Sequence, residues 1–136
     1  MEVCEGEGWR LVIDQARHPF AVLIGGQGWA AELTRDEVLV LGRAVARLCH
    51  QHAELVAQLM LEESLELELE LPLPLLAGEP GSLWMALEGD RRDWALRFVL
   101  SPGPGGRAFE GAWSAAASGP FVAALEGIEA RLGLAE

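Results

Sequence analysis

The sequence predicts an α+β fold in which curved antiparallel sheet is covered by a long central helix and a C-terminal helix. Three observations support this class: short alternating segments separated by glycine turns, one long helix with a well-marked start, and the stretch LELELEL at residues 65–71. Together they give the order βββ-α-ββββ-α. The chain has 136 residues, enough for a single domain over residues 1–136 with its own core.

Three strands are expected before the long helix. Alternate residues of 8–15 share a face, which is the pattern of a strand. FAVLI at residues 20–24 is an unbroken apolar run, and alternation resumes over residues 29–33. Between them, GGQG at residues 25–28 indicates a turn. A phosphate-binding loop is the alternative for GGQG, but a strand rather than a helix follows it, so a hairpin turn explains it better.

The long helix is expected to begin after Thr34. Thr34 and Glu37 have the spacing of a capping box, in which each side chain bonds the backbone N–H of the other residue. Apolar or weakly polar residues then recur three and four positions apart, and the helix should end at about residue 60 or 61. These residues are Val38, Leu41, Val45, Leu48, His52, Leu55 and Leu59. Such a seam favours a helix that lies across a sheet over a coiled coil.

Four more strands are expected after this helix. They are residues 65–71, 83–90, 93–100 and 107–113, with the second and third forming a hairpin. A second helix should occupy residues 118–134, with Pro120 in its first turn. Its apolar stripe consists of Phe121, Leu125, Ile128 and Leu132.

The two halves of the chain resemble each other weakly. Residues 8–61 and 64–134, approximately, both place Trp-bearing strands and a turn near Asp and Arg ahead of a helix. An internal duplication is therefore a hypothesis that one sequence cannot establish.

The alternation at residues 65–71 predicts a half-buried strand. Its leucines should face the core on the side of the long helix, and Glu66, Glu68 and Glu70 should face water. Three carboxylates on one face repel each other mildly, and Arg10 or Arg97 on a neighbouring strand would offset the repulsion.

Two prolines place this strand at an edge. Pro72 and Pro74 fall in the register of the glutamates, and neither can donate a ladder hydrogen bond. The strand should therefore lie at a sheet edge or leave the sheet by residue 72. The charges and prolines also discourage unwanted pairing with other strands.

The composition opposes polyanionic partners. The formal net charge is −11, from 21 acidic and 10 basic residues, and such a field repels nucleic acid and anionic membranes.

Cys4 and Cys49 are too few for a disulfide framework, and we expect Cys49 in the core and Cys4 at an exposed end. MEVCEGEGW lacks the apolar segment of a signal peptide, and no run reaches about 18 apolar residues. We therefore expect a soluble cytoplasmic protein.

No motif predicts catalysis or metal binding. CHQH at residues 49–52 offers thiol and imidazole ligands, but His50 should point away from the other two on a helix, and no second cluster completes a zinc site. Nothing places two carboxylates in an apolar pocket, as acid–base catalysis requires, and there is no nucleophile elbow or kinase signature. We expect a protein that is not an enzyme and holds no metal or cofactor.

Several segments resemble a known family. GWRLVIDQARHPFAVLIGGQGWAAELTRDE, LMLEESLELELE, LWMALEGDRRDWALRFVL and RAFEGAW occur in order over roughly residues 6–130. They resemble a small cyanobacterial family, number 1818 in the domain-of-unknown-function series. The resemblance implies a fold similar to the Whirly and related single-stranded-DNA-binding transcription regulators, which pack helices against strongly curved antiparallel sheets. The family has no established activity, so the resemblance transfers no catalytic or binding residue.

Arginines and tryptophans on strands and turns form the candidate binding surface. They are Arg10, Arg17, Trp29, Trp84, Arg91, Arg92, Trp94 and Arg97. Single-stranded nucleic acid needs a basic groove with aromatic platforms, and glutamates on the neighbouring elements oppose such a groove. Trp and Arg are also enriched among the residues that contribute most to binding energy at protein–protein interfaces.

The favoured interpretation is a non-enzymatic protein-binding or structural module that self-associates, with a homodimer as the simplest form. The alternative is a single-stranded nucleic-acid-binding domain of the transcription-regulator type. A contiguous groove of Arg and Trp would favour nucleic acid, whereas scattered Arg–Glu pairs would not.

Overall fold

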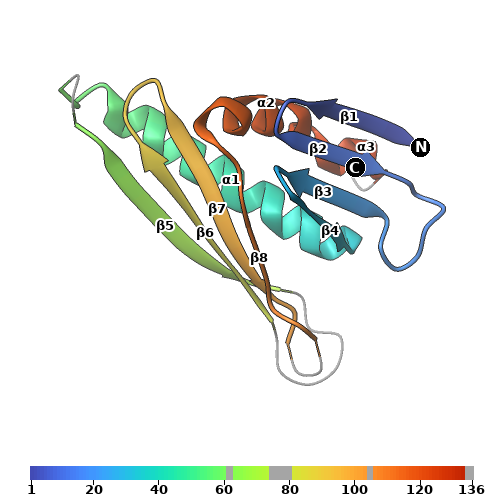
Figure 1. The fold of residues 1–136 in the computed structure, drawn as a ribbon. Helices are drawn as coiled ribbons and strands as arrows, with labels where there is room; N and C mark the ends of the chain where they lie inside the picture. The colour runs from blue at the N-terminus through green and yellow to red at the C-terminus, as the bar shows by residue number, and fades with distance from the viewer. Residues whose placement is uncertain (61–62, 74–80, 104–105, 134–136) are drawn as a thin grey trace.

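The computed structural model describes residues 1–60, 63–73, 81–103 and 106–133, and it contains two four-stranded antiparallel sheets (Figure 1). Sheet A consists of β1 (Glu2–Gly6), β2 (Trp9–Ile13), β3 (Val22–Gly26) and β4 (Trp29–Leu33), in that order. Sheet B consists of β5 (Leu65–Pro72), β6 (Ser82–Gly89), β7 (Trp94–Ser101) and β8 (Phe109–Ala112), in that order. The helices are α1 (Arg35–Val56), α2 (Ala115–Leu125) and α3 (Ile128–Arg131). The predicted α+β class and element order are confirmed, and β1 is added ahead of the expected strands.

A repeated hairpin explains the added strand. GEGW at residues 6–9 joins β1 to β2, and GQGW at residues 26–29 joins β3 to β4. The second glycine of each turn has a positive φ, 81° at Gly8 and 80° at Gly28, which other residues rarely adopt. In each hairpin the Trp ring also lies against the first glycine, where a Cβ atom would overlap the indole. GGQG is therefore a hairpin turn, as predicted.

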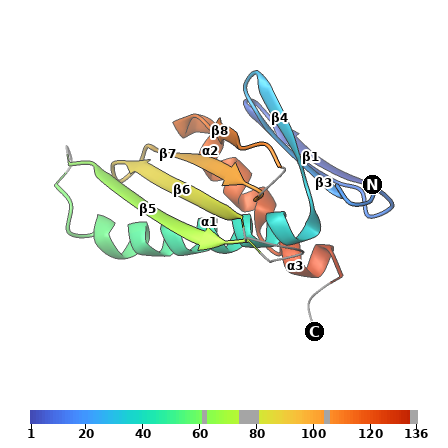
Figure 2. The ribbon, with the colours of Figure 1, turned by 90° about the horizontal axis from the view of Figure 1, so that it is seen from below.

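α1 begins at the predicted cap. The Glu37 N–H donates to Thr34 Oγ1 at 3.2 Å, and the Thr34 N–H donates to Glu37 Oε1 at 2.8 Å, which is the predicted capping box. Most of the predicted seam is buried, from Val38 to His52, and the helix lies across the inner face of β5 and β6 (Figure 2). The helix ends at Val56 rather than at residue 60 or 61, and residue 61 lies outside the described residues. Leu55 is already 38% exposed, so the core does not support another turn.

The C-terminal helix differs from the prediction at both ends. It begins at Ala115, capped by Ser114, so that Pro120 lies in its second turn rather than its first. It stops after Leu125, and Gly127, with a φ of 72°, lets the chain turn into the short α3. The break keeps the predicted apolar stripe in the core, because Phe121, Leu125, Ile128 and Leu132 are all buried. Residue 134, the predicted end, lies outside the described residues.

Ser118 ties α2 to sheet B. The Leu96 N–H of β7 donates to Ser118 Oγ at 3.1 Å, while the Leu96 carbonyl accepts from the Trp113 N–H at 2.9 Å. The same hydroxyl lies 2.8 Å from the Ser114 carbonyl, to which it donates. A side-chain oxygen therefore supplies the acceptor for a strand N–H at the point where the chain leaves the sheet and enters the helix.

LELELEL forms the predicted half-buried strand. Exposure alternates along β5, with the leucines half-buried and the glutamates exposed, and α1 packs beneath the leucines. β5 lies at the edge of sheet B, as the prolines predicted. Pro72 is the last residue of the strand, and Pro74 lies outside the described residues.

Two tryptophans join the sheets. Trp29 on β4 donates its indole N–H to the Ala112 carbonyl on β8 at 3.0 Å, and Trp113, directly after β8, donates to the Gly25 carbonyl on β3 at 2.9 Å. The two rings meet edge to face, with centroids 5.2 Å apart. Each sheet therefore supplies one donor and one acceptor, and the apolar core is continuous across both sheets and the helices.

Each half of the chain contains four strands followed by helical structure. The internal duplication itself stays a prediction. Among the helices of the described ranges, none is long and apolar enough to cross a membrane.

Candidate functional site

The outer face of sheet B brings charged and aromatic side chains together on one surface. Side chains that point away from α1 alternate along its strands with the buried ones. We refer to this surface as the acidic face; its residues are Glu66, Glu68, Glu70, Trp84, Ala86, Glu88, Arg97, Val99 and Glu110. It therefore presents five carboxylates, one guanidinium and one indole on a single sheet surface.

Arg97 and Trp84 form the centre of the acidic face. The Arg97 guanidinium lies 4.9 Å from the centroid of the Trp84 ring, and its Nη2 atom lies 3.2 Å from Glu66 Oε2. This ion pair spans from β7 to β5 and confirms Arg97 as a cation that offsets the row of glutamates. Ala86 on β6 is paired in register with Glu68 on β5 and with Arg97 on β7. Ala86 is fully buried, because the longer side chains around it cover it.

A shallow pocket of about 320 Å³ adjoins this centre, lined by Trp84, Arg97, Val99 and Glu110 among others. Both Arg97 and its partner Glu66 remain about half exposed, so the ion pair contributes at most about 1 kcal/mol to stability.

The other candidate arginines lie elsewhere. Arg10 pairs with Glu5 at 3.3 Å rather than with the glutamates of β5, and Arg17 pairs with Glu32 at 3.0 Å. Arg91 and Arg92 are exposed in the turn between β6 and β7. The five arginines are therefore not brought into one groove, and three of them form separate Arg–Glu pairs on different elements.

Two of the candidate tryptophans are engaged within the fold. Trp29 is part of the junction between the sheets, where it also packs on Phe98 with ring centroids 5.7 Å apart. Trp94 packs beside the imidazole of His52, with centroids 5.9 Å apart. Of the eight candidate residues, Trp84 and Arg97 are the pair that the structure brings into contact on an outer surface.

The residues of CHQH point to different surroundings. His52 is buried, and its Nε2 atom lies 2.9 Å from the Asp90 carbonyl, which requires that nitrogen to carry the proton and donate. His50 is exposed and lies 2.7 Å from Glu54. Within the described ranges, no group of three or more His, Cys, Asp or Glu side chains is placed to hold a metal ion.

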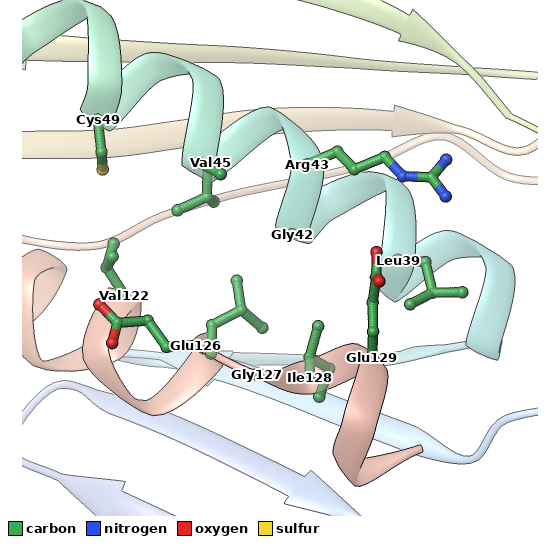
Figure 3. Close-up of a pocket in the computed structure, with 12 residues that line it drawn as sticks. Leu39, Gly42, Arg43, Val45, Cys49, Val122, Glu126, Gly127, Ile128 and Glu129 are labelled. Carbon is green, nitrogen blue, oxygen red and sulfur yellow. The ribbon is translucent and has the colours of Figure 1, made fainter. Parts of the chain in front are cut away.

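An apolar groove between α1 and the α2–α3 segment was not predicted. It has a volume of about 450 Å³, and Figure 3 shows Val45 and Cys49 reaching into it from α1 and Val122 and Ile128 from the opposite side. Arg43 lines the α1 side, and Glu126 and Glu129 line the other. The sequence signal that could have predicted this groove is Gly127, which lies between the two glutamates. A glycine there breaks the C-terminal helix, and the break leaves a gap beside the straight helix α1.

The two cysteines sit differently from the prediction. Cys49 lines the groove and is half-buried, and burial, with a smaller effect of the nearby Glu126 charge, raises the pKa of its thiol to about 11. Cys4 is also half-buried rather than exposed, because β1 is a paired strand; Arg131 Nη2 lies 3.8 Å from its sulfur. On its other contact, the Cys4 thiol donates to Glu2 Oε2 at 3.7 Å.

Comparison with solved structures finds the same fold in another protein. The chain is similar to a crystal structure described as a protein with unknown function from the DUF155 family of Prochlorococcus sp. NATL2A: the two are 35% identical, the match covers 94% of this chain and 98% of that chain, and the TM-score is 0.80. No curated protein matches the chain. The family described as "Domain of unknown function (DUF1818)" matches residues 4–128. Because this match spans most of the sequence, the chain belongs to the DUF1818 family.

Proposed function

We propose that this chain is a cytoplasmic, non-enzymatic protein-binding module that engages a basic partner through the acidic face. The observation that carries the proposal is the composition of that face: five exposed or half-exposed carboxylates surround an indole and a guanidinium that are already in contact.

The physical argument combines packing and charge. Trp and Arg residues at the centre of a patch are the side chains that most often dominate binding energy. The surrounding glutamates attract a cationic partner and increase its rate of encounter, and this attraction weakens as salt screens the charges. The same field repels the phosphates of nucleic acid.

The first test measures binding of a lysine-rich, fluorescently labelled peptide by anisotropy at low and physiological salt. We expect binding that weakens with salt, weakens further in Trp84→Ala, and is strongly reduced in the triple variant Glu66→Gln, Glu68→Gln, Glu70→Gln. The matched control replaces Glu5, Glu7 and Glu54 by Gln. These glutamates are exposed and lie outside the acidic face, and their replacement changes the net charge by the same amount. Equal loss in both triple variants would reduce the effect to net charge alone and contradict a defined face.

Self-association is a second candidate, favoured by the apolar groove. Its two sides carry opposite charges, Arg43 on α1 and Glu126 and Glu129 on the α2–α3 segment. A two-fold symmetric contact would set Arg43 of one copy near the glutamates of the other. Light scattering after size exclusion tests this: a dimer that Ala46→Glu abolishes supports the groove, and a monomer at high concentration removes self-association.

Binding of single-stranded nucleic acid is the alternative, and it follows from the expectation that the fold of this family is similar to that of the Whirly-type regulators. It predicts a salt-dependent change in tryptophan fluorescence when an oligonucleotide is added. We expect no change even at low salt, because the candidate arginines are not gathered in one groove and three of them, Arg10, Arg17 and Arg97, are paired with glutamates. A change that saturates would replace the protein-binding proposal.

A further inference from the structure

The open edge of β5 offers a set of unpaired backbone groups whose identity follows from the register. In an antiparallel pair, residues alternate between positions that bond the neighbouring strand and positions that point away from it. The Leu73 N–H donates to the Gly81 carbonyl at 3.0 Å, one step beyond the Pro72–Ser82 pair of the ladder. Odd-numbered residues of β5 therefore bond β6, and even-numbered residues face the open edge.

The groups at the open edge are thus the N–H and C=O of Glu66, Glu68 and Glu70. Pro72 is the next even-numbered residue, so its missing N–H falls at the edge, where it costs no ladder bond. Both Figure 1 and Figure 2 show β5 at the margin of sheet B, beside α1. Within residues 1–60, 63–73, 81–103 and 106–133, no backbone hydrogen bond reaches these three residues from outside the sheet.

The leucines of β5 leave apolar surface uncovered at the same edge. Leu67, Leu69 and Leu71 contact the core but stay half-exposed. On the next strand, Leu83 and Leu87 face the same side and are buried to 1% and 0% exposure. The difference arises because β5 is the outermost of the described strands of sheet B, so that none of these strands covers its leucines from beyond.

We infer that β5 binds an extended segment of another protein in which cationic and apolar residues alternate, and that this segment adds a strand to sheet B. The inference rests on the proposed function and specifies its partner. Cations of the added strand would lie beside the carboxylates of Glu66, Glu68 and Glu70, and its apolar residues would cover the half-exposed leucines on the α1 side. Main-chain hydrogen bonds to the edge groups would fix the register.

The same register rejects a second copy of β5. Residues that face the open edge in one copy must bond residues that face it in the other, so an antiparallel pair places Glu directly opposite Glu. Like charges in directly opposed positions destabilise a sheet. The charged edge therefore discriminates between its own copies and a cationic strand, rather than blocking every partner.

The test uses a labelled peptide as long as β5, eight residues, that alternates Lys and Val. A second peptide has the same composition with the Lys and Val in two blocks, and a third carries N-methyl groups on the backbone nitrogens that would face β5. We expect the alternating peptide to bind at least about tenfold more tightly than either of the others, because each lost main-chain hydrogen bond weakens binding several-fold.

Two variants of the protein separate charge from backbone. Glu68→Gln removes one carboxylate and keeps the edge N–H, whereas Glu68→Pro removes both without breaking a bond to β6. We expect a loss of about twofold to fivefold for Glu68→Gln and a clearly larger loss for Glu68→Pro, with circular dichroism reporting whether the proline variant folds. Amide hydrogen exchange gives a readout on the unmodified protein: binding should slow exchange at Glu66, Glu68 and Glu70 and leave Leu67 and Leu69 unchanged.

The outcomes are distinguishable. If the block and N-methylated peptides bind as well as the alternating one, strand addition is wrong while binding of a basic partner stands. If no cationic peptide binds at low salt, the proposed function fails as well. A dimer that Glu68→Pro abolishes would assign the edge to a second copy and overturn the inference.

Discussion

Replacing Ser118 by alanine isolates one buried hydrogen-bond acceptor. Ser118 is fully buried, and the substitution removes a single oxygen, so the packing is almost unchanged. The Leu96 N–H, which donates to that oxygen at 3.1 Å, is left without its partner in the core. An unsatisfied buried donor costs about 1–3 kcal/mol, and we expect Ser118→Ala to lower the free energy of unfolding by about 2 kcal/mol.

Urea unfolding followed by tryptophan fluorescence measures this loss. With an m-value of about 2 kcal/mol per molar urea, the midpoint should fall by about 1 M while the slope stays the same. Ser64→Ala, at an exposed serine, is the control and should change stability by less than about 0.5 kcal/mol. If Ser118→Ala lowers the free energy of unfolding as little as the control does, Ser118 is not an important acceptor for the Leu96 N–H of β7.

Three further predictions concern charge and pH. The variant with Glu66, Glu68 and Glu70 all replaced by Gln should fold, and its free energy of unfolding should lie within about 1 kcal/mol of that of the parent protein, because these side chains are solvated. A much lower free energy of unfolding in urea would contradict the outward orientation of the three glutamates. Burial raises the pKa of the Cys49 thiol to about 11 from an ordinary value of 9.0, so the unfolded chain loses this proton first and stability should fall between pH 9 and 11. Cys49→Ala should flatten that slope, and iodoacetamide should modify Cys49 more slowly in the folded protein than in urea at pH 8.5; equal rates would contradict the burial. Backbone N–H groups of Asp93 and Arg92 hold the pKa of Asp90 below its usual 3.8. The stability they confer should be complete above about pH 4 and lost as the pH falls through the folded-state pKa, and Asp90→Asn should show a shallower acid dependence; an unchanged profile would show that the turn contributes nothing.

Local signals in the sequence predicted the elements that local contacts determine. The capping box of Thr34 and Glu37 involves residues three apart, and the alternation of LELELEL is complete within one strand, so both could be read directly. β1 could not, because EVCEG has neither the apolar alternation nor the β-branched content of a strand, and it is held by its hairpin with β2. The signal that was available was the repeated Gly-x-Gly-Trp turn.

The candidate site was predictable only in part, because it depends on pairing between distant residues. Arg97 was expected to offset the glutamates of β5, and it does so across one intervening strand. Arg10 was an equal candidate by composition, but it lies on sheet A and pairs with Glu5. The role of Trp29 was also invisible in the sequence, since its acceptor Ala112 is 83 positions away.

The reciprocal indole bonds between the sheets have a consequence for how the molecule unfolds. If sheet A opened alone, the indole N–H of Trp113 would lose the Gly25 carbonyl, and the Ala112 carbonyl would lose the indole of Trp29. The same two losses occur if sheet B opens alone, so neither half has a low-energy route to separate melting. The protein should therefore lose both sheets in one cooperative transition, with coincident curves from fluorescence and circular dichroism, and either half expressed without the other should not retain its native core.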